Sequence, residues 1–195
     1  MILKSGIATF FSRTKNCLNI FFSSRNLIIF QSFNYIKTFE LNMSNLIANK
    51  KHIENALLAS RFAILATEGK GQPHMSLIAI TPVGGFRKLI FSTYRNTVKY
   101  SNLIENGKVA VLIENGDCKN YSLQGNFILT AYGQAEEIKV DNDSILQAHL
   151  DRHPEMISFI QSEECALIQI TVNAFQLVLG IEDVHWYTLD DLDSI

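Results

Sequence analysis

Short apolar segments joined by tight turns make up most of the chain after residue 60. Residues 62–67 and 74–81 flank a stretch dense in turn formers at 68–73, the pattern of a β-hairpin. Further strand candidates lie at 88–92, 108–114, 126–139 with a bend at Gly133, 165–172, 175–179 and 184–187. Strands joined by tight turns pair antiparallel, and a long meander tends to close into a barrel because closure removes exposed edges. The segment order therefore predicts a mainly β fold, an antiparallel barrel of six to eight strands.

Three short helical regions accompany the strands. Residues 44–60 read as an amphipathic helix capped by Ser44 or Asn45, with an apolar stripe of Leu46, Ile47, Ile53, Leu57 and Leu58. A second helix is expected over 97–105, because Asn106-Gly107 is a stop signal. A third is expected over 144–152, capped by Asp143. Pro154 then ends it or begins another turn of helix through Gln161.

Residues 1–42 differ from the rest of the chain in charge and in patterning. They hold five basic residues and one acidic residue, whereas the remainder holds 12 basic and 18 acidic residues. We favour Met43 as the natural start, which makes residues 1–42 a start-site artefact or a disordered tail and 43–195 the folded domain. A mitochondrial-type transit peptide stays open as an alternative. A membrane span is disfavoured, because Arg13, Lys15 and Arg25 interrupt every apolar run.

Composition excludes several classes of protein. With 47% hydrophobic and 18% charged residues the chain can build a core, and a net charge of -2 argues against a general nucleic-acid binder. Cys17, Cys118 and Cys165 form no C-x-x-C motif and no disulfide framework. We therefore expect a cytoplasmic, reducing setting, with neither nucleic acid nor a membrane as partner.

The segment from residue 87 to residue 103 combines an apolar strand, a polar turn and the start of a helix. Thr97 and Lys99 stand two residues apart at the expected helix start, preceded by Ser92, Thr93 and Arg95. Free backbone N–H groups at a helix start, together with hydroxyl and cationic side chains, form an anion site. The pattern indicates a phosphate or a carboxylate. The alternative is an ordinary cap, Asn96 or Thr97, beside solvated cations.

The order of these parts resembles the pyridoxamine 5'-phosphate oxidase-like, FMN-binding split-barrel family. Residues 61–67 with 71–76 look like its opening hairpin, and Ala131-Tyr132-Gly133-Gln134-Ala135 looks like its central G-x-A strand. The stretch 103–111 looks like its helix-to-strand continuation, with Gly107 where the family commonly has proline. Residues 153–168 look like its late helix and following strand. The resemblance covers residues 57–187.

The resemblance implies a split barrel that binds FMN and works as an oxidoreductase on a small-molecule substrate or electron donor. It implies a homodimer with the flavin at the subunit interface. The expected phosphate and ribityl contacts are Arg87, Lys88, Ser92, Thr93, Thr97 and Lys99. The expected ring-edge contacts are Met75, Ser76, Leu77 and Gln134. The resemblance assigns no catalytic acid or base, since flavin reductases often need none from the protein, and the catalytic residues stay unknown. The alternatives are a non-enzymatic FMN- or haem-binding module and a haem-degrading relative.

The end of the chain departs from the family pattern. Pyridoxamine-phosphate oxidases end in a W-x-R-x-R-type pattern that serves flavin and substrate phosphate. Here the chain reads His185-Trp186-Tyr187-Thr188-Leu189-Asp190-Asp191, without arginine. The missing cations argue against the vitamin-phosphate substrate. We expect the acidic tail to be a solvated end.

Four histidines are candidates for contact with a metal ion, a flavin or a haem. His149 and His153 are spaced i, i+4, which places two imidazoles on one helix face as in many metal sites. No adjacent glutamate or cysteine set completes such a site, so we expect a surface or half-buried pair and no metal. His74 and His185 each allow two interpretations, a structural side chain or one that reaches a flavin ring or a haem.

Overall fold

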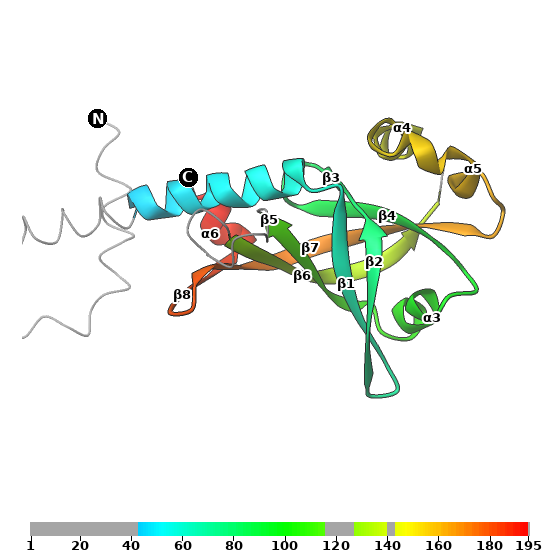
Figure 1. Cartoon of the computed structure of the whole chain (residues 1–195), viewed down its shortest axis with the longest axis horizontal. Coiled ribbons are helices and arrows are strands. Elements are labelled where there is room, and N and C mark those ends of the chain that lie inside the picture. The colour runs from blue at the N-terminus through cyan, green and yellow to red at the C-terminus, as the bar shows by residue number, and fades with distance from the viewer. Residues whose placement is uncertain (1–42, 116–126, 140–142, 195) are drawn as a thin grey trace, which may run out of the picture. The chain divides into compact units, whose positions relative to one another are not determined.

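The computed structural model describes residues 43–115, 127–139 and 143–194, and its architecture is an antiparallel sheet with short helices (Figure 1). The strands are β1 (Phe62–Gly69), β2 (Gln72–Ala79), β3 (Thr81–Val83), β4 (Lys88–Tyr94), β5 (Lys108–Asn115), β6 (Phe127–Ile138), β7 (Cys165–Gly180) and β8 (Asp183–Thr188). Each described pairing is antiparallel. The predicted mainly β fold is confirmed. Residues 1–42, the predicted turn after Asn115, Cys17 and Cys118 lie outside the described residues, so the predicted domain boundary stays a prediction.

The strand order explains why the sheet curls into a split barrel. Along the sheet the strands run β2-β1-β5-β6-β7-β4-β3, and β8 pairs with β7. Strands β2 and β3 stand at opposite ends of this path, yet only Ile80 separates them in the sequence. The Ile80 N–H donates to the Arg61 carbonyl at 2.9 Å. The two ends of the sheet must therefore meet, and the sheet bends around its inner side.

Two local features shape the strands as the sequence predicts. The β1–β2 hairpin turns through Lys70 and Gly71, with φ of 54° and 81°, the conformation of a two-residue type I′ turn. In β6 the register with β7 shifts between Tyr132 and Gly133. A Cβ at Gly133 would lie 2.3 Å from the Thr171 carbonyl oxygen, so only glycine permits this close approach.

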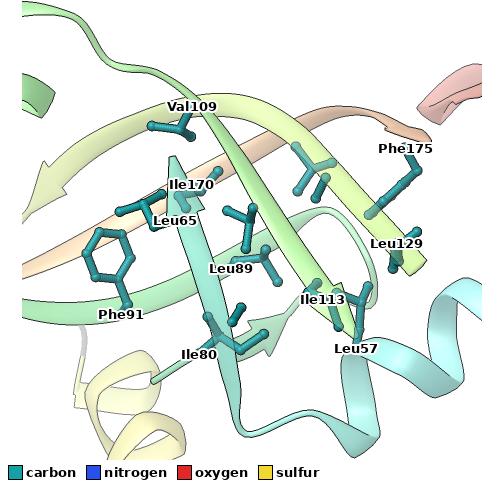
Figure 2. Close-up of a cluster of buried hydrophobic side chains, with 14 of the residues drawn as sticks. Leu57, Leu65, Ile80, Leu89, Phe91, Val109, Ile113, Leu129, Ile170 and Phe175 are labelled. Carbon is teal, nitrogen blue, oxygen red and sulfur yellow. The ribbon is translucent and has the colours of Figure 1, made fainter. Parts of the chain in front are cut away.

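Alternate side chains of the strands fill the inner side with an apolar core (Figure 2). Figure 2 shows Leu65 from β1, Leu89 and Phe91 from β4, Ile113 from β5 and Ile170 from β7 converging on one cluster. The helix over residues 43–59 packs against this cluster. Its contribution is Ile53, Ala56 and Leu57, the i, i+3, i+4 pattern of one helix face.

The predicted apolar stripe on this helix was only partly right. Ile53 and Leu57 are buried and Leu46 packs against the core, but Ile47 and Leu58 are exposed. Positions 47 and 58 lie on the flanks of the stripe, so they face away from the barrel.

The remaining described helices are α3 (Val98–Glu105), α4 (Asp143–Arg152), the 3-10 turn η2 (Pro154–Met156), α5 (Ile157–Ile160) and α6 (Leu189–Asp193). The first three agree with the predicted helices. The acidic side chains of the tail, Asp190, Asp191 and Asp193, are exposed as expected, but the tail also folds into helix α6 and anchors on the barrel. A capping box joins Thr188 and Asp191, and Leu192 is fully buried, while the Lys50 Nζ donates to the Leu192 carbonyl at 2.8 Å. Within the described residues no helix is long and apolar enough to cross a membrane.

Candidate functional site

The inner side of the barrel changes from apolar to polar on the approach to α3. Thr67 on β1 follows the core residue Leu65 by two positions, and Thr93 on β4 follows the core residue Phe91 by two positions. Both threonines are almost fully buried. Ser76 on β2 pairs with the core residue Leu65 and so shares its face. The Asn102 side chain on α3 donates to Thr67 Oγ1 at 3.1 Å. The Ser76 hydroxyl is buried and has no hydrogen-bond partner among the described residues.

Thr97 begins α3 and holds its first turn. Its backbone is extended, and its Oγ1 accepts a hydrogen bond from the Tyr100 N–H at 3.4 Å, the geometry of an N-cap. The same hydroxyl donates to the Tyr94 carbonyl at 2.8 Å and lies 3.2 Å from Thr93 Oγ1. The structure thus brings together two of the predicted hydroxyl residues at the positive end of a helix.

Lys99 lies in the first turn of α3 and is half-buried. Burial lowers the pKa of its ammonium group. In the described part of the chain it makes no hydrogen bond or ion pair. An ammonium that is partly desolvated and lacks a carboxylate partner is a favourable place for an anion. We call Thr93, Thr97 and Lys99 the anion site.

Arg95, just before the helix, is already engaged. It forms an ion pair with Glu137 on β6, and its Nη1 donates to the carbonyls of Glu163 and Cys165 at 2.8 and 2.9 Å. The hydrogen bond to Glu137 raises the pKa of Arg95. Tyr100 donates to the same carboxylate at 2.6 Å. Arg95 therefore fixes the turn that leads into α3, and Lys99 is the cation of this segment that is left for a ligand.

Two other predicted phosphate contacts lie at the far end of β4. The Arg87 Nη2 donates to both carboxylate oxygens of Asp193 on α6 at 2.7 and 2.6 Å, and the Lys88 Nζ donates to Gln169 at 3.2 Å. A strand rises roughly 3.3 Å per residue, so about 16 Å of strand separates Lys88 from Thr93. The structure does not bring Arg87 and Lys88 to the anion site.

Ser92 and Thr93 point to opposite faces of β4, because successive side chains alternate across a strand. Thr93 faces the barrel interior, whereas the Ser92 Oγ lies 3.1 Å from Nε2 of His149 on α4. Ser92 is therefore separate from the anion site, although the sequence grouped the two hydroxyls.

The predicted ring-edge contacts also divide between two faces. Ser76 faces inward, but Met75 and Leu77 are 72% and 69% exposed on the outer face of β2. Gln134 is exposed on β6 and covers Gly107, where an added Cβ would lie 2.2 Å from its Nε2 and 2.6 Å from the Ala135 carbonyl oxygen. This close approach explains a glycine at position 107.

Exposed apolar side chains lie on the outer face of the sheet, on β1 and β2 at one end of a row of six strands and on β8 at the other, with Thr130 and Gln176 between them. Register places one row of residues side by side from β2 to β8: Leu77, Ile64, Leu112, Thr130, Gln176 and Trp186. Trp186 is 54% exposed and its ring lies 4.8 Å from that of Tyr132 in the neighbouring row. We define the outer apolar face by its exposed members, Phe62, Ile64, Met75, Leu77, Val184 and Trp186. An exposed apolar face of this extent marks an interaction surface.

The histidine pair is more deeply buried than the sequence suggested. His149 and His153 are both 0% exposed, and their rings lie 5.1 Å apart. The expectation of a surface or half-buried pair was wrong, because α4 lies with this face against β3 and β4. The His149 Nδ1 lies 2.8 Å from the Thr81 hydroxyl, and the His153 Nε2 donates to the Ile80 carbonyl at 3.0 Å. The described residues contain no group of three or more metal-ligating side chains.

Ser92, His149 and Thr81 have the connectivity of a nucleophilic triad, with a hydroxyl on each ring nitrogen. The Thr81 hydroxyl stands where such a triad has a carboxylate, and burial lowers the pKa of His149 to about 4, so His149 is a weak base toward Ser92. The arrangement is structural. The i, i+4 spacing was the signal that could have found it, but burial depends on how α4 docks.

Arg152 completes this buried cluster. Its Nε donates to the Ile80 carbonyl at 3.1 Å, and its Nη2 contacts the carbonyls of Leu57, Leu58 and Ser60 at 3.3, 2.8 and 2.7 Å. These carbonyls lie at the C-terminal end of the helix over 43–59, where a cation is favourable. Nothing in the sequence pattern indicated this role, which joins segments about 95 residues apart.

Comparison with known proteins identifies the family. A family model described as pyridoxamine 5'-phosphate oxidase matches residues 50–173, which is more than half of the chain. The chain belongs to the pyridoxamine 5'-phosphate oxidase family, and the resemblance seen in its sequence is confirmed. No match was found among curated proteins.

Solved structures share the fold at low sequence identity. A haem-binding protein from Mycobacterium smegmatis is similar with a TM-score of 0.64 and 19% identity, over 73% of this chain and 60% of that one. A Clostridium acetobutylicum protein related to general stress protein 26, of the pyridoxinephosphate oxidase family, gives 0.59 and 17%, over 73% and 98%. The haem storage protein HutZ from Vibrio cholerae gives 0.54 and 15%, over 71% and 92%.

Proposed function

We propose that this protein is an FMN-binding flavoprotein that acts as an oxidoreductase on a small molecule. The observation that carries the proposal is the anion site, in which the Thr93 and Thr97 hydroxyls lie 3.2 Å apart at the start of α3 and Lys99, which has no partner among the described residues, lies in the first turn of the helix. It lies within the part of the chain that the family model matches. A cytoplasmic location is part of the proposal, from the cysteine pattern alone.

The residues of the anion site fit a phosphate monoester. The first N–H groups of a helix have no intrahelical acceptor and point toward a bound anion. Lys99 adds a charge and the Thr93 hydroxyl adds a donor, while Thr97, whose own proton goes to the Tyr94 carbonyl, holds the helix start in place. Charge-assisted hydrogen bonds contribute roughly 1.5–3 kcal/mol each. The buried Ser76 hydroxyl, which lacks a partner among the described residues, suits a ribityl hydroxyl.

FMN would supply the hydride chemistry, and this chain would position and bury the cofactor. In this arrangement the anion site holds the phosphate on the inner side, and the ring passes the edge of β2, an end strand of the sheet, to lie against Met75 and Leu77 on its outer face. An isoalloxazine ring needs an apolar slot, which an exposed strand face provides only when a second surface covers it.

We further propose that the covering surface is a second copy of this chain, packed on the outer apolar face. Leu77→Glu would place a charge in that contact and yield a monomer in light scattering at micromolar concentration. Ile181→Glu is the matched control, because Ile181 is equally apolar and 92% exposed but lies in the β7–β8 turn. A monomeric wild-type protein with flavin bound would contradict the shared pocket.

The test of cofactor identity is the visible absorption spectrum of the purified full chain, followed by titration with FMN and riboflavin. A flavoprotein shows a pair of bands in the blue and near-ultraviolet and binds FMN much more tightly than riboflavin. Equal affinity for the two flavins would contradict the proposal that the anion site binds the FMN phosphate.

Haem is the second candidate ligand, either in a binding module or in a haem-degrading relative. The observation that favours it is the fold similarity to a haem-binding protein and a haem storage protein. His74 and His185 are candidate ligands, although the His185 Nε2 lies 2.7 Å from an Asp183 carboxylate oxygen. A single intense band in the same spectrum, lost in His74→Ala or His185→Ala, would select haem over flavin.

A further inference from the structure

The docking of α4 on the barrel depends on one imidazole. His149 lies in the last turn of α4, and its two ring nitrogens contact hydroxyls on two different strands. Nδ1 is 2.8 Å from Thr81 on β3, and Nε2 is 3.1 Å from Ser92 on β4. One side chain therefore joins the helix to both strands.

The hydrogen bonds themselves do not select a protonation state. A hydroxyl both donates and accepts, so either neutral tautomer and the imidazolium ion satisfy both ring nitrogens. Burial selects the neutral form of the imidazole, because His149 is 0% exposed and a charged ring would lose its contact with water. Burial, followed by the nearby positive charge of a protonated His153, lowers the pKa of His149 to about 4.

The charged groups around the pair offer His149 no compensation. The rings of His149 and His153 are in edge contact, and the carboxylate on this side, Glu155, lies 3.7 Å from Nδ1 of His153 rather than near His149. Glu155 is itself paired with Arg61 at 2.6 Å, and Arg152 adds a second cation. The groups that contact His149 from β3 and β4 are the neutral Thr81 and Ser92.

We propose that His149 is an acid-sensitive latch: the neutral imidazole holds α4 against β3 and β4, and protonation releases the helix while the barrel stays folded. The release is local because the core cluster inside the barrel contains no α4 residue. This inference does not depend on the proposed flavin.

The expected size follows from linkage. Once α4 is open, His149 is solvated and recovers an ordinary pKa near 6.5, so protons favour the open state below that pH. For closed and open pKa values of about 4 and about 6.5, the opening constant rises about 30-fold between pH 7.5 and pH 5.

Hydrogen–deuterium exchange on the ligand-free full chain measures this opening. Peptides covering 143–152 should lose about 30-fold in protection between pH 7.5 and pH 5, after correction for the pH dependence of intrinsic exchange. Peptides of β5 and β6 should keep their protection. In His149→Gln, which retains a donor and an acceptor but does not titrate, the α4 change should shrink to about threefold or less.

Two further variants and one measurement on the wild-type protein test whether the pH response of α4 belongs to His149. His185→Gln on β8 is the matched control and should respond as wild type does. Loss of the response in His153→Gln, with His149 intact, would overturn the assignment to His149. If His149→Gln fails to fold, NMR titration of the wild-type histidines decides. Protonation of His149 below about pH 5 together with α4 opening supports the latch, and titration near pH 6.5 with α4 still protected overturns it.

Discussion

Strand β4 separates two polar clusters that are built in opposite ways. On its inner face Thr93 lies 3.2 Å from the Thr97 hydroxyl, and the half-buried ammonium of Lys99 in the first turn of α3 has no partner within the described residues. On its outer face Ser92 joins His149, whose two ring nitrogens both contact hydroxyls. Ser92 and Thr93 are adjacent in the sequence and both carry a hydroxyl, but their surroundings differ.

The difference separates a ligand site from a structural one. The outer cluster fills most of its hydrogen-bonding capacity from within, through His149, Arg152 and backbone carbonyls, although the buried Nδ1 of His153 has no hydrogen-bond partner among the described residues. The inner cluster leaves Lys99 and the Ser76 hydroxyl without partners in the described chain. Buried polar groups normally have partners, so the unpartnered groups of the inner cluster indicate a ligand, whereas the hydrogen bonds of Ser92, His149 and Arg152 indicate a role in stability. Variants of the outer cluster should therefore lower stability, and variants of the inner cluster should lower binding.

The largest effect is expected for Arg152→Ala. This change removes donors from the carbonyls of Ile80, Leu58 and Ser60 and strips the charge from a helix C-terminus. Losing several charge-assisted bonds should lower the free energy of unfolding by about 3 kcal/mol. Urea denaturation measures this loss.

The matched control for Arg152→Ala is Arg61→Ala, because Arg61 is an exposed arginine in the same network. Its ion pair with Glu155 is solvent-exposed, so removal should cost about 0.5 kcal/mol. Equal losses for the two variants would mean that Arg152 does not hold the helix end.

Lys99→Ala should give the next largest effect, on binding instead of stability. Removal of the ammonium should weaken FMN by about tenfold or more, which is about 1.4 kcal/mol, and leave riboflavin nearly unchanged. Calorimetry with both flavins measures the difference. Stability should not fall, because the ammonium has no partner to lose in the described structure. Lys51→Ala, on an exposed face of the helix over 43–59, is the control.

The sequence was sufficient for the fold and for part of the site. Turn residues such as Lys70-Gly71 and the spacing of apolar segments define strands and hairpins locally, and Thr97 carries its cap signal in its own neighbourhood. The pairing of Arg95 with Glu137, 42 residues away, depends on sheet register and was not readable.

The two faces of β4, in contrast, could have been predicted from the sequence. Alternation along the strand already implies that Ser92 and Thr93 diverge, and the rise per residue implies that Lys88 is far from Thr93. Grouping them by chemistry ignored the geometry of an extended strand. The burial of His149 required the docking of α4, which depends on contacts with β3 and β4 that no local pattern encodes.

Thr97→Ala tests whether one hydroxyl serves both the helix and the anion. Loss of the N-cap should lower the free energy of unfolding by about 1 kcal/mol, and FMN should weaken by about fivefold through the same change. Thr97→Ser keeps the hydroxyl and should restore both properties in denaturation and titration experiments. Rescue of stability without rescue of FMN affinity would separate the cap from the ligand.

The smallest effect on FMN, and the most direct comparison of the two faces, is expected for Ser92→Ala beside Thr93→Ala. Each change removes one hydroxyl from neighbouring positions of β4. Because Ser92 bonds to His149 on the outer face, its loss should lower stability by about 1 kcal/mol and change FMN affinity by less than about twofold. Thr93 lies 3.2 Å from the Thr97 hydroxyl, so its loss should weaken FMN by about fivefold. If Ser92→Ala weakens FMN as much as Thr93→Ala does, the two faces of β4 are coupled and the division between ligand site and structural cluster does not hold.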